Sequence, residues 1–151
     1  MLKRVYEAVR SNFPADRPIW VRISATDWVE GGWDADESVA LGKMMKEWGV
    51  DLVDTSTGGN SPLQKIANLG PSYQVGFSDR IRREAAIPTG AVGLISGADQ
   101  ADGIVRSGQA DVVLLARELL RNPYFPLAAA HRLGHEIEWP EQYVRGKFRV
   151  R

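Results

Sequence analysis

The sequence predicts an α/β domain built around a parallel β-sheet. Short apolar segments alternate with amphipathic helical patterns, and strict alternation of this kind requires parallel strands with right-handed crossovers. The 151 residues are enough for one domain with a genuine core. Two architectures fit this order, an open doubly wound sheet or part of a (β/α)8 barrel. Because a complete barrel needs about 250 residues, four βα units would form half of one.

Four segments have the composition of buried parallel strands. Most are rich in Val, Leu and Ile and are bounded by Gly, Pro or Asp, as expected where both faces of a sheet are covered. The predicted strands are residues 19–24, 51–56, 88–93 and 111–117. The third has small residues in place of branched ones and is assigned mainly from its position between two helical patterns.

Helical patterns precede, separate and follow these strands. Their apolar stripes are Leu2, Val5, Tyr6 and Val9; Leu41, Met44, Met45 and Trp48; Phe77, Ile81 and Ala85; and Ala101, Ile104 and Val105. Asp34 or Asp36 can serve as the N-cap of the second helix, and Gly49 stands where that helix ends. After the fourth strand we expect a short helix at 118–122 and a longer one over 126–133.

The joint between a helix and the next strand has the same form twice. The segments 49–53 (GVDLV) and 108–113 (GQADVV) each place a glycine shortly before an aspartate and a pair of apolar strand residues. This similarity indicates that the βα unit is repeated along the chain.

Composition and charge exclude several classes of protein. The 19 Lys and Arg residues balance 19 Asp and Glu residues, so no net field favours nucleic acid or an anionic membrane. The absence of cysteine excludes a disulfide scaffold, a Cys-ligated metal site and thiolate catalysis. No apolar stretch approaches the ~20 residues that cross a bilayer, and the N-terminus has no signal-peptide pattern. The acidic loop at 27–37 is interpreted as solvated and helix-capping. We therefore expect a cytoplasmic protein without a metal site.

The first strand carries a cation within an apolar run. Arg22 shares one face of the predicted strand with Trp20 and Ser24. A buried guanidinium must find an acceptor, because desolvating an unpaired charge is expensive. Either Asp54 on the neighbouring strand forms an internal ion pair with Arg22, or Arg22 is a fixed cation that faces an anionic ligand or an electron-rich ring.

The segments after the other strands are candidates for ligand binding, since functional groups gather at the carboxyl ends of parallel strands. The long segment 56–74 is either a flexible surface loop or a substrate-facing loop. Gly93 and Ser96 precede a helix, and Arg117 begins the short extra helix. Backbone N–H groups at such turns form an anion site together with an arginine. In (β/α)8 barrels the loops after strands seven and eight often bind phosphate.

Several segments resemble the Old Yellow Enzyme family, and most closely its bacterial thermophilic-like branch of FMN-dependent NADPH dehydrogenases and ene-reductases. They are 20–25 (WVRISA), 49–54 (GVDLVD), 73–75 (YQV), 87–95 (IPTGAVGLI) and 116–123 (ARELLRNP). The resemblance extends over essentially the whole chain, in order and with matching spacing. It implies that the four strands correspond to strands five to eight of the family's barrel. Residues 1–151 would then form a single half-barrel domain of FMN-binding type, with a C-terminal tail at 140–151.

The resemblance also implies roles for particular residues. Arg22 resembles the arginine that faces the pyrimidine edge of the flavin. Gly93, Ala116 and Arg117 resemble the residues that hold the FMN phosphate, although the family usually has glycine at position 116. Arg145, within 142–147 (QYVRGK), matches an arginine that reaches into a neighbouring subunit's active site; the alternative interpretation is a frayed basic tail.

The family's carbonyl-binding pair, its tyrosine proton donor and its flavin-tuning Cys or Thr belong to the half that this sequence does not match, so we assign no catalytic residue. We expect the C-terminal half of an FMN-dependent oxidoreductase, in which hydride passes from NADPH to FMN and then to an activated, enone-type alkene. Alone, the chain would be inactive or would only bind FMN. The alternative is a non-catalytic phosphate-binding half-barrel or assembly module. Open sheet edges predict a homo-oligomer.

Overall fold

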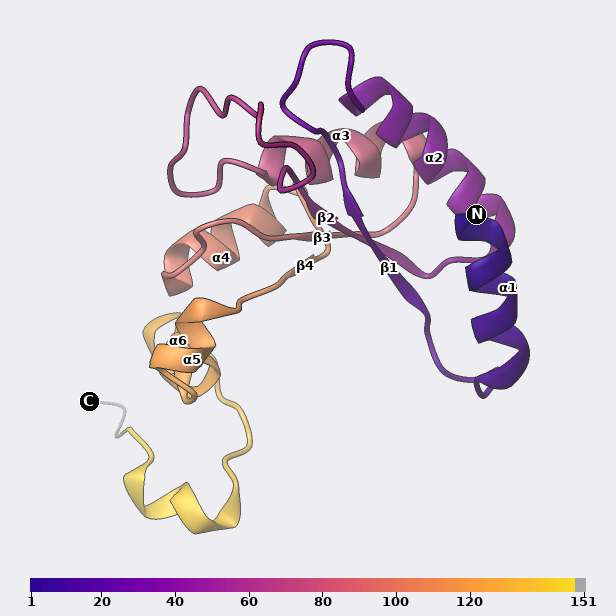
Figure 1. The fold of residues 1–151 in the computed structure, drawn as a ribbon. Coiled ribbons are helices and arrows are strands. Elements are labelled where there is room, and N and C mark those ends of the chain that lie inside the picture. The colour runs from indigo at the N-terminus through magenta and orange to yellow at the C-terminus, as the bar shows by residue number, and fades with distance from the viewer. Residues whose placement is uncertain (149–151) are drawn as a thin grey trace.

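The computed structural model, which describes residues 1–148, contains one parallel sheet of four strands (Figure 1). The strands are β1 (Trp20–Ser24), β2 (Leu52–Ser56), β3 (Thr89–Ala91) and β4 (Val112–Val113). They lie side by side in the order β1-β2-β3-β4, which is also their order along the chain. The parallel α/β prediction is confirmed, and β1 and β4 are the two edges of the sheet.

Helices alternate with the strands as the sequence predicts. They are α1 (Leu2–Asn12), α2 (Ala35–Trp48), α3 (Val75–Ala85), α4 (Ala98–Arg106), α5 (Arg117–Arg121) and α6 (Phe125–Arg132). A 3-10 helix, η1 (Glu141–Gly146), lies in the tail and was not predicted. The last three residues of the predicted tail at 140–151 lie outside the described part of the chain. No helix within residues 1–148 is long and apolar enough to cross a lipid bilayer.

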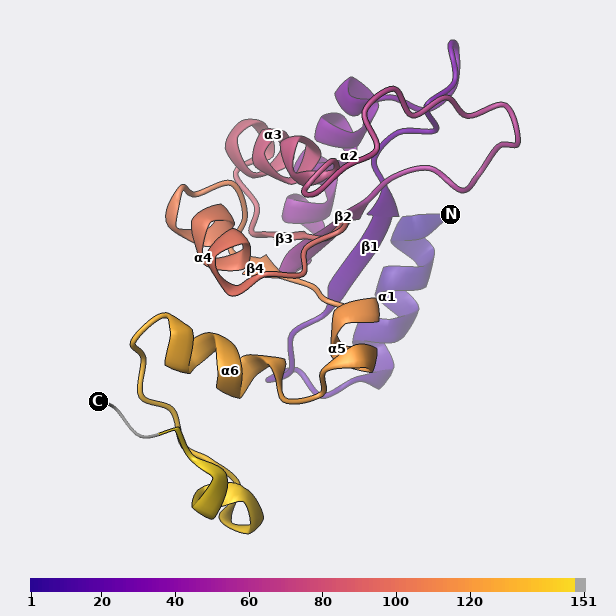
Figure 2. The same ribbon diagram turned by 90° about the vertical axis from the view of Figure 1, so that its left-hand side faces the viewer.

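The core lies between one face of the sheet and the helices. Val53 and Ile23 on the strands pack with Tyr6 of α1, Met45 of α2 and Ile81 of α3. A second cluster surrounds Ala91 of β3 and Ile104 of α4. A doubly wound sheet would carry helices on both faces and reverse its strand order. The unbroken strand order, with α1 to α4 packed on one face of the sheet, instead matches half of a (β/α)8 barrel. Figure 2 shows the fold from the side, with α5 and α6 below the strands.

The structure shows which of the two candidate aspartates, Asp34 or Asp36, is the N-cap of α2. Asp34 is the N-cap, and its side chain accepts the N–H of Glu37 while the Glu37 carboxylate accepts the N–H of Asp34. Asp36 instead pairs with Arg80 of α3. The helix ends at Gly49, whose φ of 89° is in the left-handed region that favours glycine.

The inner face of the sheet explains why β3 has small residues. Gly90 lies beside Asp54 of β2 and Val112 of β4 in the strand register. A Cβ atom at Gly90 would overlap Leu114 and would lie 3.4 Å from Leu52. The glycine therefore makes room for larger side chains from the neighbouring strands, as expected for layered packing inside a barrel.

Candidate functional site

Arg22 and Asp54 are neighbours across the parallel strands β1 and β2. Arg22 Nε lies 3.1 Å from Asp54 Oδ2, so the predicted ion-pair partner is confirmed. The expectation of a buried guanidinium is wrong: the Arg22 side chain is 56% exposed, whereas the Asp54 side chain is only 9% exposed. Arg22 belongs to the edge strand and to the inner face, and the outer helices do not cover that face. Arg22 therefore presents a positive charge at the open side of the half-barrel.

The Asp54 carboxylate is incompletely satisfied. Its Oδ1 is buried and has no hydrogen-bond partner within residues 1–148. Burial raises the pKa of Asp54 above its usual value, and the positive charge of Arg22 offsets only part of this rise. A carboxylate in this situation is a candidate functional group, because buried polar atoms in proteins almost always have partners.

The loop after β3 turns sharply at Gly93. Its φ of 118° suits glycine, and a Cβ there would lie 2.6 Å from Gln74 Nε2. Gln74 is 5% exposed. It accepts a hydrogen bond from Thr57 Oγ1 at 2.7 Å and donates one to the Val92 carbonyl oxygen at 3.3 Å. Gln74 thus connects the long loop after β2 to the loop after β3.

Gln100 of α4 braces the same loop from the other side. Its Nε2 donates to Ser72 Oγ at 2.8 Å and to the Leu94 carbonyl oxygen at 3.1 Å, and its Oε1 accepts the N–H of Ser96 at 3.1 Å. Reasoning from the sequence assigned no role to Gln74 or Gln100. The only indication that Gln74 matters was that segment 73–75 is among those resembling the family, and nothing in the sequence indicated a role for Gln100.

Gly93, Ala116 and Arg117 line one pocket of ≈ 400 Å³ at the carboxyl ends of β3 and β4. The backbone N–H groups of these three residues donate to no acceptor within residues 1–148. The Arg117 side chain is exposed and forms no ion pair with any residue of the same range, whereas Arg121 nearby is paired with Glu118 at 2.7 Å. Free N–H groups and an uncommitted guanidinium are what a phosphate group requires.

Alanine at position 116 is compatible with this arrangement. Its φ of −107° is negative and so lies outside the left-handed region that favours glycine. The φ angle at this position thus does not require glycine, and the N–H of Ala116 stays available.

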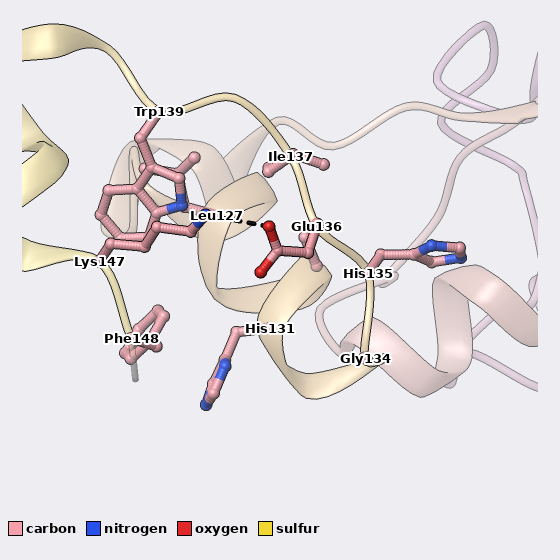
Figure 3. Close-up of a pocket in the computed structure, with 10 residues that line it drawn as sticks. Leu127, His131, Gly134, His135, Glu136, Ile137, Trp139, Lys147 and Phe148 are labelled. Atoms are coloured by element: carbon pink, nitrogen blue, oxygen red, sulfur yellow. Dashed lines mark hydrogen bonds and ion pairs between the residues drawn. The ribbon is translucent and has the colours of Figure 1, made fainter. Parts of the chain in front are cut away.

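The structure places Arg22 and Arg145 away from this pocket. Arg22 lies on the opposite edge strand of the sheet. Arg145 lies in η1, and the tail packs on α6 through Tyr143 against Tyr124, whose ring centroids are 5.1 Å apart. Figure 3 shows the seam between α6 and the tail, a second region of contact with a pocket of ≈ 190 Å³. There Phe148 stacks on His131, and Lys147 pairs with Glu136. The described part of the tail therefore packs beside α6.

The acidic loop before α2 is used for structure. Asp27 accepts the N–H of Trp33 at 3.1 Å and a hydrogen bond from Asn60 Nδ2 at 2.8 Å. Across residues 1–148, no three His, Asp or Glu side chains gather as metal ligands would.

The residues at the strand ends fit FMN. The phosphate would meet the free N–H groups and Arg117, and the glycine at 93 leaves the space that a side chain would fill. Arg22 lies on the opposite edge strand from these residues. At that distance it would contact the flavin ring, at the other end of the elongated ligand.

Comparison with known proteins agrees with this geometry. Residues 2–136 match the NADH:flavin oxidoreductase / NADH oxidase family. The chain is 52% identical to an NADPH dehydrogenase of Geobacillus thermodenitrificans and 47% identical to one of Bacillus licheniformis, over 145 residues in each case. These alignments cover 96% of this chain but only 42% of either relative, so the chain spans less than half of their length.

Solved structures support the fold alone. Histamine dehydrogenase from Rhizobium sp. 4-9 superposes with a TM-score of 0.68 and 22% identity, covering 88% of this chain and 19% of that one. The resemblance to the Old Yellow Enzyme family and the half-barrel fold are thus confirmed, and the family indicates FMN as cofactor and NADPH as reductant. By its sequence and its fold, the chain belongs to the NADH:flavin oxidoreductase / NADH oxidase family.

Proposed function

We propose that this chain is the FMN-binding half of an NADPH-dependent flavin oxidoreductase. The observation that carries the proposal is the uncommitted Arg117 in one pocket with the free N–H groups of Gly93 and Ala116. A charge-assisted contact to phosphate needs this combination of a guanidinium fork and backbone donors. Family membership supports FMN as the ligand.

Arg22 would act at the other end of the ligand. Its exposed guanidinium is paired with Asp54 on one side only, so it can stabilise negative charge on a neighbouring ring. When bound, FMN supplies the hydride chemistry that links NADPH to an activated alkene of the enone type. The contribution of this chain is to hold the phosphate and to place a fixed positive charge near the pyrimidine edge of the ring.

Enone reduction requires more than a bound flavin. That reaction needs donors for the substrate carbonyl and a proton for the alkene carbon. The two histidines, His131 and His135, line the seam between α6 and the tail (Figure 3) and do not line the pocket that contains Arg117. We therefore infer that substrate reduction depends on a second half-barrel. A neighbouring copy could also bring Arg145 to the site, because that side chain is exposed.

A second candidate is a phosphate-binding assembly module without redox activity. It is favoured by the same pocket together with the unpaired edge strands β1 and β4. This candidate needs only the anion site, whereas the proposed function also needs a contact between Arg22 and the flavin ring.

Titration of the chain with FMN, riboflavin and inorganic phosphate, followed by flavin fluorescence and calorimetry, tests the proposal. We expect FMN to bind and riboflavin, which lacks the phosphate, to bind at least tenfold more weakly. Binding of phosphate with no retention of either flavin would favour the assembly module. Failure to bind either FMN or phosphate would exclude both candidates.

A further inference from the structure

The ion pair between Arg22 and Asp54 is one-sided. Arginine and carboxylate groups frequently meet through two parallel N–H···O contacts. Here Nε lies 3.1 Å from Oδ2 as an ion pair only, and no guanidinium nitrogen of Arg22 donates a hydrogen bond to any residue in the described range 1–148. Asp54 Oδ1 is likewise without a partner in that range. Each member of the pair thus keeps an unused group.

The two unused groups lie in different environments. Asp54 is 7% exposed and occupies the second strand of the sheet, where β1 and β3 cover its flanks. The Arg22 side chain is 56% exposed on the edge strand. Their strand register places both side chains on the inner face of the sheet. The carboxylate is therefore fixed within the sheet, and the free end of the guanidinium is presented at the open side.

Asp54 is poorly explained as a stabilising group. An ionised carboxylate with an unsatisfied buried oxygen is unfavourable, and a single ion pair to a largely exposed arginine recovers little of that loss. An apolar residue, like Leu52 two positions earlier on the same face, would fill the space at less expense. A buried charge that opposes stability is expected where function requires it.

We infer that Asp54 is a positioning residue for Arg22, holding the Nε side of the guanidinium so that its Nη groups face the ligand. The inference rests on the proposed function and deepens it, because the ligand in question is the flavin ring. Asp54 itself is buried and does not touch the ligand. Its effect on flavin binding must therefore pass entirely through Arg22.

A double-mutant cycle tests this dependence. Lumiflavin is a suitable probe, because it carries the isoalloxazine ring without the ribityl chain or the phosphate. We expect Asp54→Asn to weaken lumiflavin binding roughly three- to tenfold, and to have no further effect when introduced into Arg22→Gln. A role limited to folding would lower affinity equally in both backgrounds, and that result would overturn the inference. Arg106→Ala, on α4 and outside the pocket, is the control and should leave lumiflavin binding unchanged.

A measurement without flavin keeps the inference separable from the proposed function. The Nε signal of Arg22 in a ¹⁵N–¹H spectrum, assigned with Arg22→Lys, reports on the carboxylate charge beside it. It should shift in Asp54→Asn and Asp54→Ala relative to the parent. Asp111→Asn is the matched control, because it removes the partner of Arg82, which lies 3.0 Å from Asp111. In that control the Arg82 signal should change and the Arg22 signal should not.

The two experiments fail in different ways. If the parent binds no flavin, the proposed function is wrong, and the Arg22 signal alone decides whether Asp54 holds the guanidinium. If flavin binds and the Arg22 signal is the same in the parent and in both Asp54 variants that fold, the positioning role is wrong while the proposed function stands.

Discussion

Asp111 accepts the N–H of Thr89 just as Asp51 accepts the N–H of Ile19. The distances from nitrogen to Oδ2 are 2.9 Å and 2.7 Å. In both pairs the backbone N–H of the aspartate donates in return to the carbonyl oxygen of its neighbour, at 2.8 Å and 3.1 Å. The helix-to-strand joint that occurs twice in the sequence therefore ties adjacent strands together twice at their amino ends. This end of a barrel serves stability, whereas the opposite end serves ligand binding.

Asp111 should contribute to stability in a pH-dependent way. Burial raises the pKa of Asp111, but the hydrogen bonds from Arg82 and the Thr89 N–H outweigh this and leave the pKa below its ordinary value of 3.8. A depressed pKa gives stability that is present above the ordinary value and is lost as the pH falls through the folded-state value. We expect Asp111→Asn to reduce the free energy of unfolding by about 1 kcal/mol at neutral pH, an amount limited by partial exposure.

Urea denaturation at neutral and acid pH measures this effect. The difference between Asp111→Asn and the parent should shrink as the medium becomes acid enough to protonate Asp111 in the parent. Asp102→Asn, which removes an i,i+4 pair with Arg106 within α4 and no hydrogen bond from a backbone N–H, is the control and should change stability less. An equal difference at all pH values would contradict the prediction.

Arg117→Ala should weaken FMN binding by about 1.5–3 kcal/mol, because it removes a charge-assisted contact to the phosphate. Calorimetric or fluorescence titration gives the affinity. Arg106→Ala removes an exposed arginine from α4, outside the pocket, and should bind FMN like the parent. If Arg117→Ala bound FMN as tightly as the parent, the phosphate site would be misassigned.

Gly93→Ala should destabilise the fold by about 1–3 kcal/mol, since it forces a left-handed φ on alanine and drives a methyl group against Gln74. Thermal denaturation followed by circular dichroism measures the change. Gly76 in α3 has no neighbour within 4 Å of an added Cβ, so Gly76→Ala should be neutral or stabilising. Similar melting temperatures for both variants would show that the loop after β3 adjusts freely.

The chain should form dimers or larger assemblies at micromolar concentration. The edge strands β1 and β4 are unpaired within one copy, and Trp20 on β1 is 50% exposed. Sedimentation velocity measures the assembly state. Trp20→Lys should shift it toward monomer, whereas Leu63→Lys, in the loop after β2, should not. A parent that sediments as a stable monomer would refute this prediction.

The isolated chain loaded with FMN should oxidise NADPH slowly with oxygen and should not reduce cyclohexenone. The first reaction requires a bound flavin with an open face, and the second also requires carbonyl and proton donors. Absorbance assays of NADPH consumption with and without the enone distinguish the two, and free FMN at equal concentration is the reference. Cyclohexenone turnover that Arg22→Ala abolishes would show that this half-barrel supplies those donors itself.

Local signals in the sequence predicted most of the fold. The order of the strands and the end of α2 at Gly49 follow from residue types and spacing, and a pair between Arg22 and Asp54 was one of two alternatives. The choice of Asp34 over Asp36 as the N-cap required the structure. The exposure of Arg22 could not be predicted, because it depends on what covers the inner face of the sheet.

Parts of the candidate site were also inaccessible to sequence reasoning. The brace formed by Gln74 and Gln100 joins residues from separate loops, and a glutamine in a loop carries no pattern that predicts its partners. The 3-10 helix at Glu141–Gly146 is too short to show a periodic signal.

The order of the strands bears on how the protein acquires its structure. Every strand pairs only with the strand that precedes or follows it in the chain. The length of chain between two paired strands is therefore short, and contacts between segments that are close in the sequence favour rapid folding. Each βα unit can therefore add to the sheet as soon as it leaves the ribosome, without waiting for a distant segment. A sheet assembled in this sequential way can be extended or shortened at its edges by whole units.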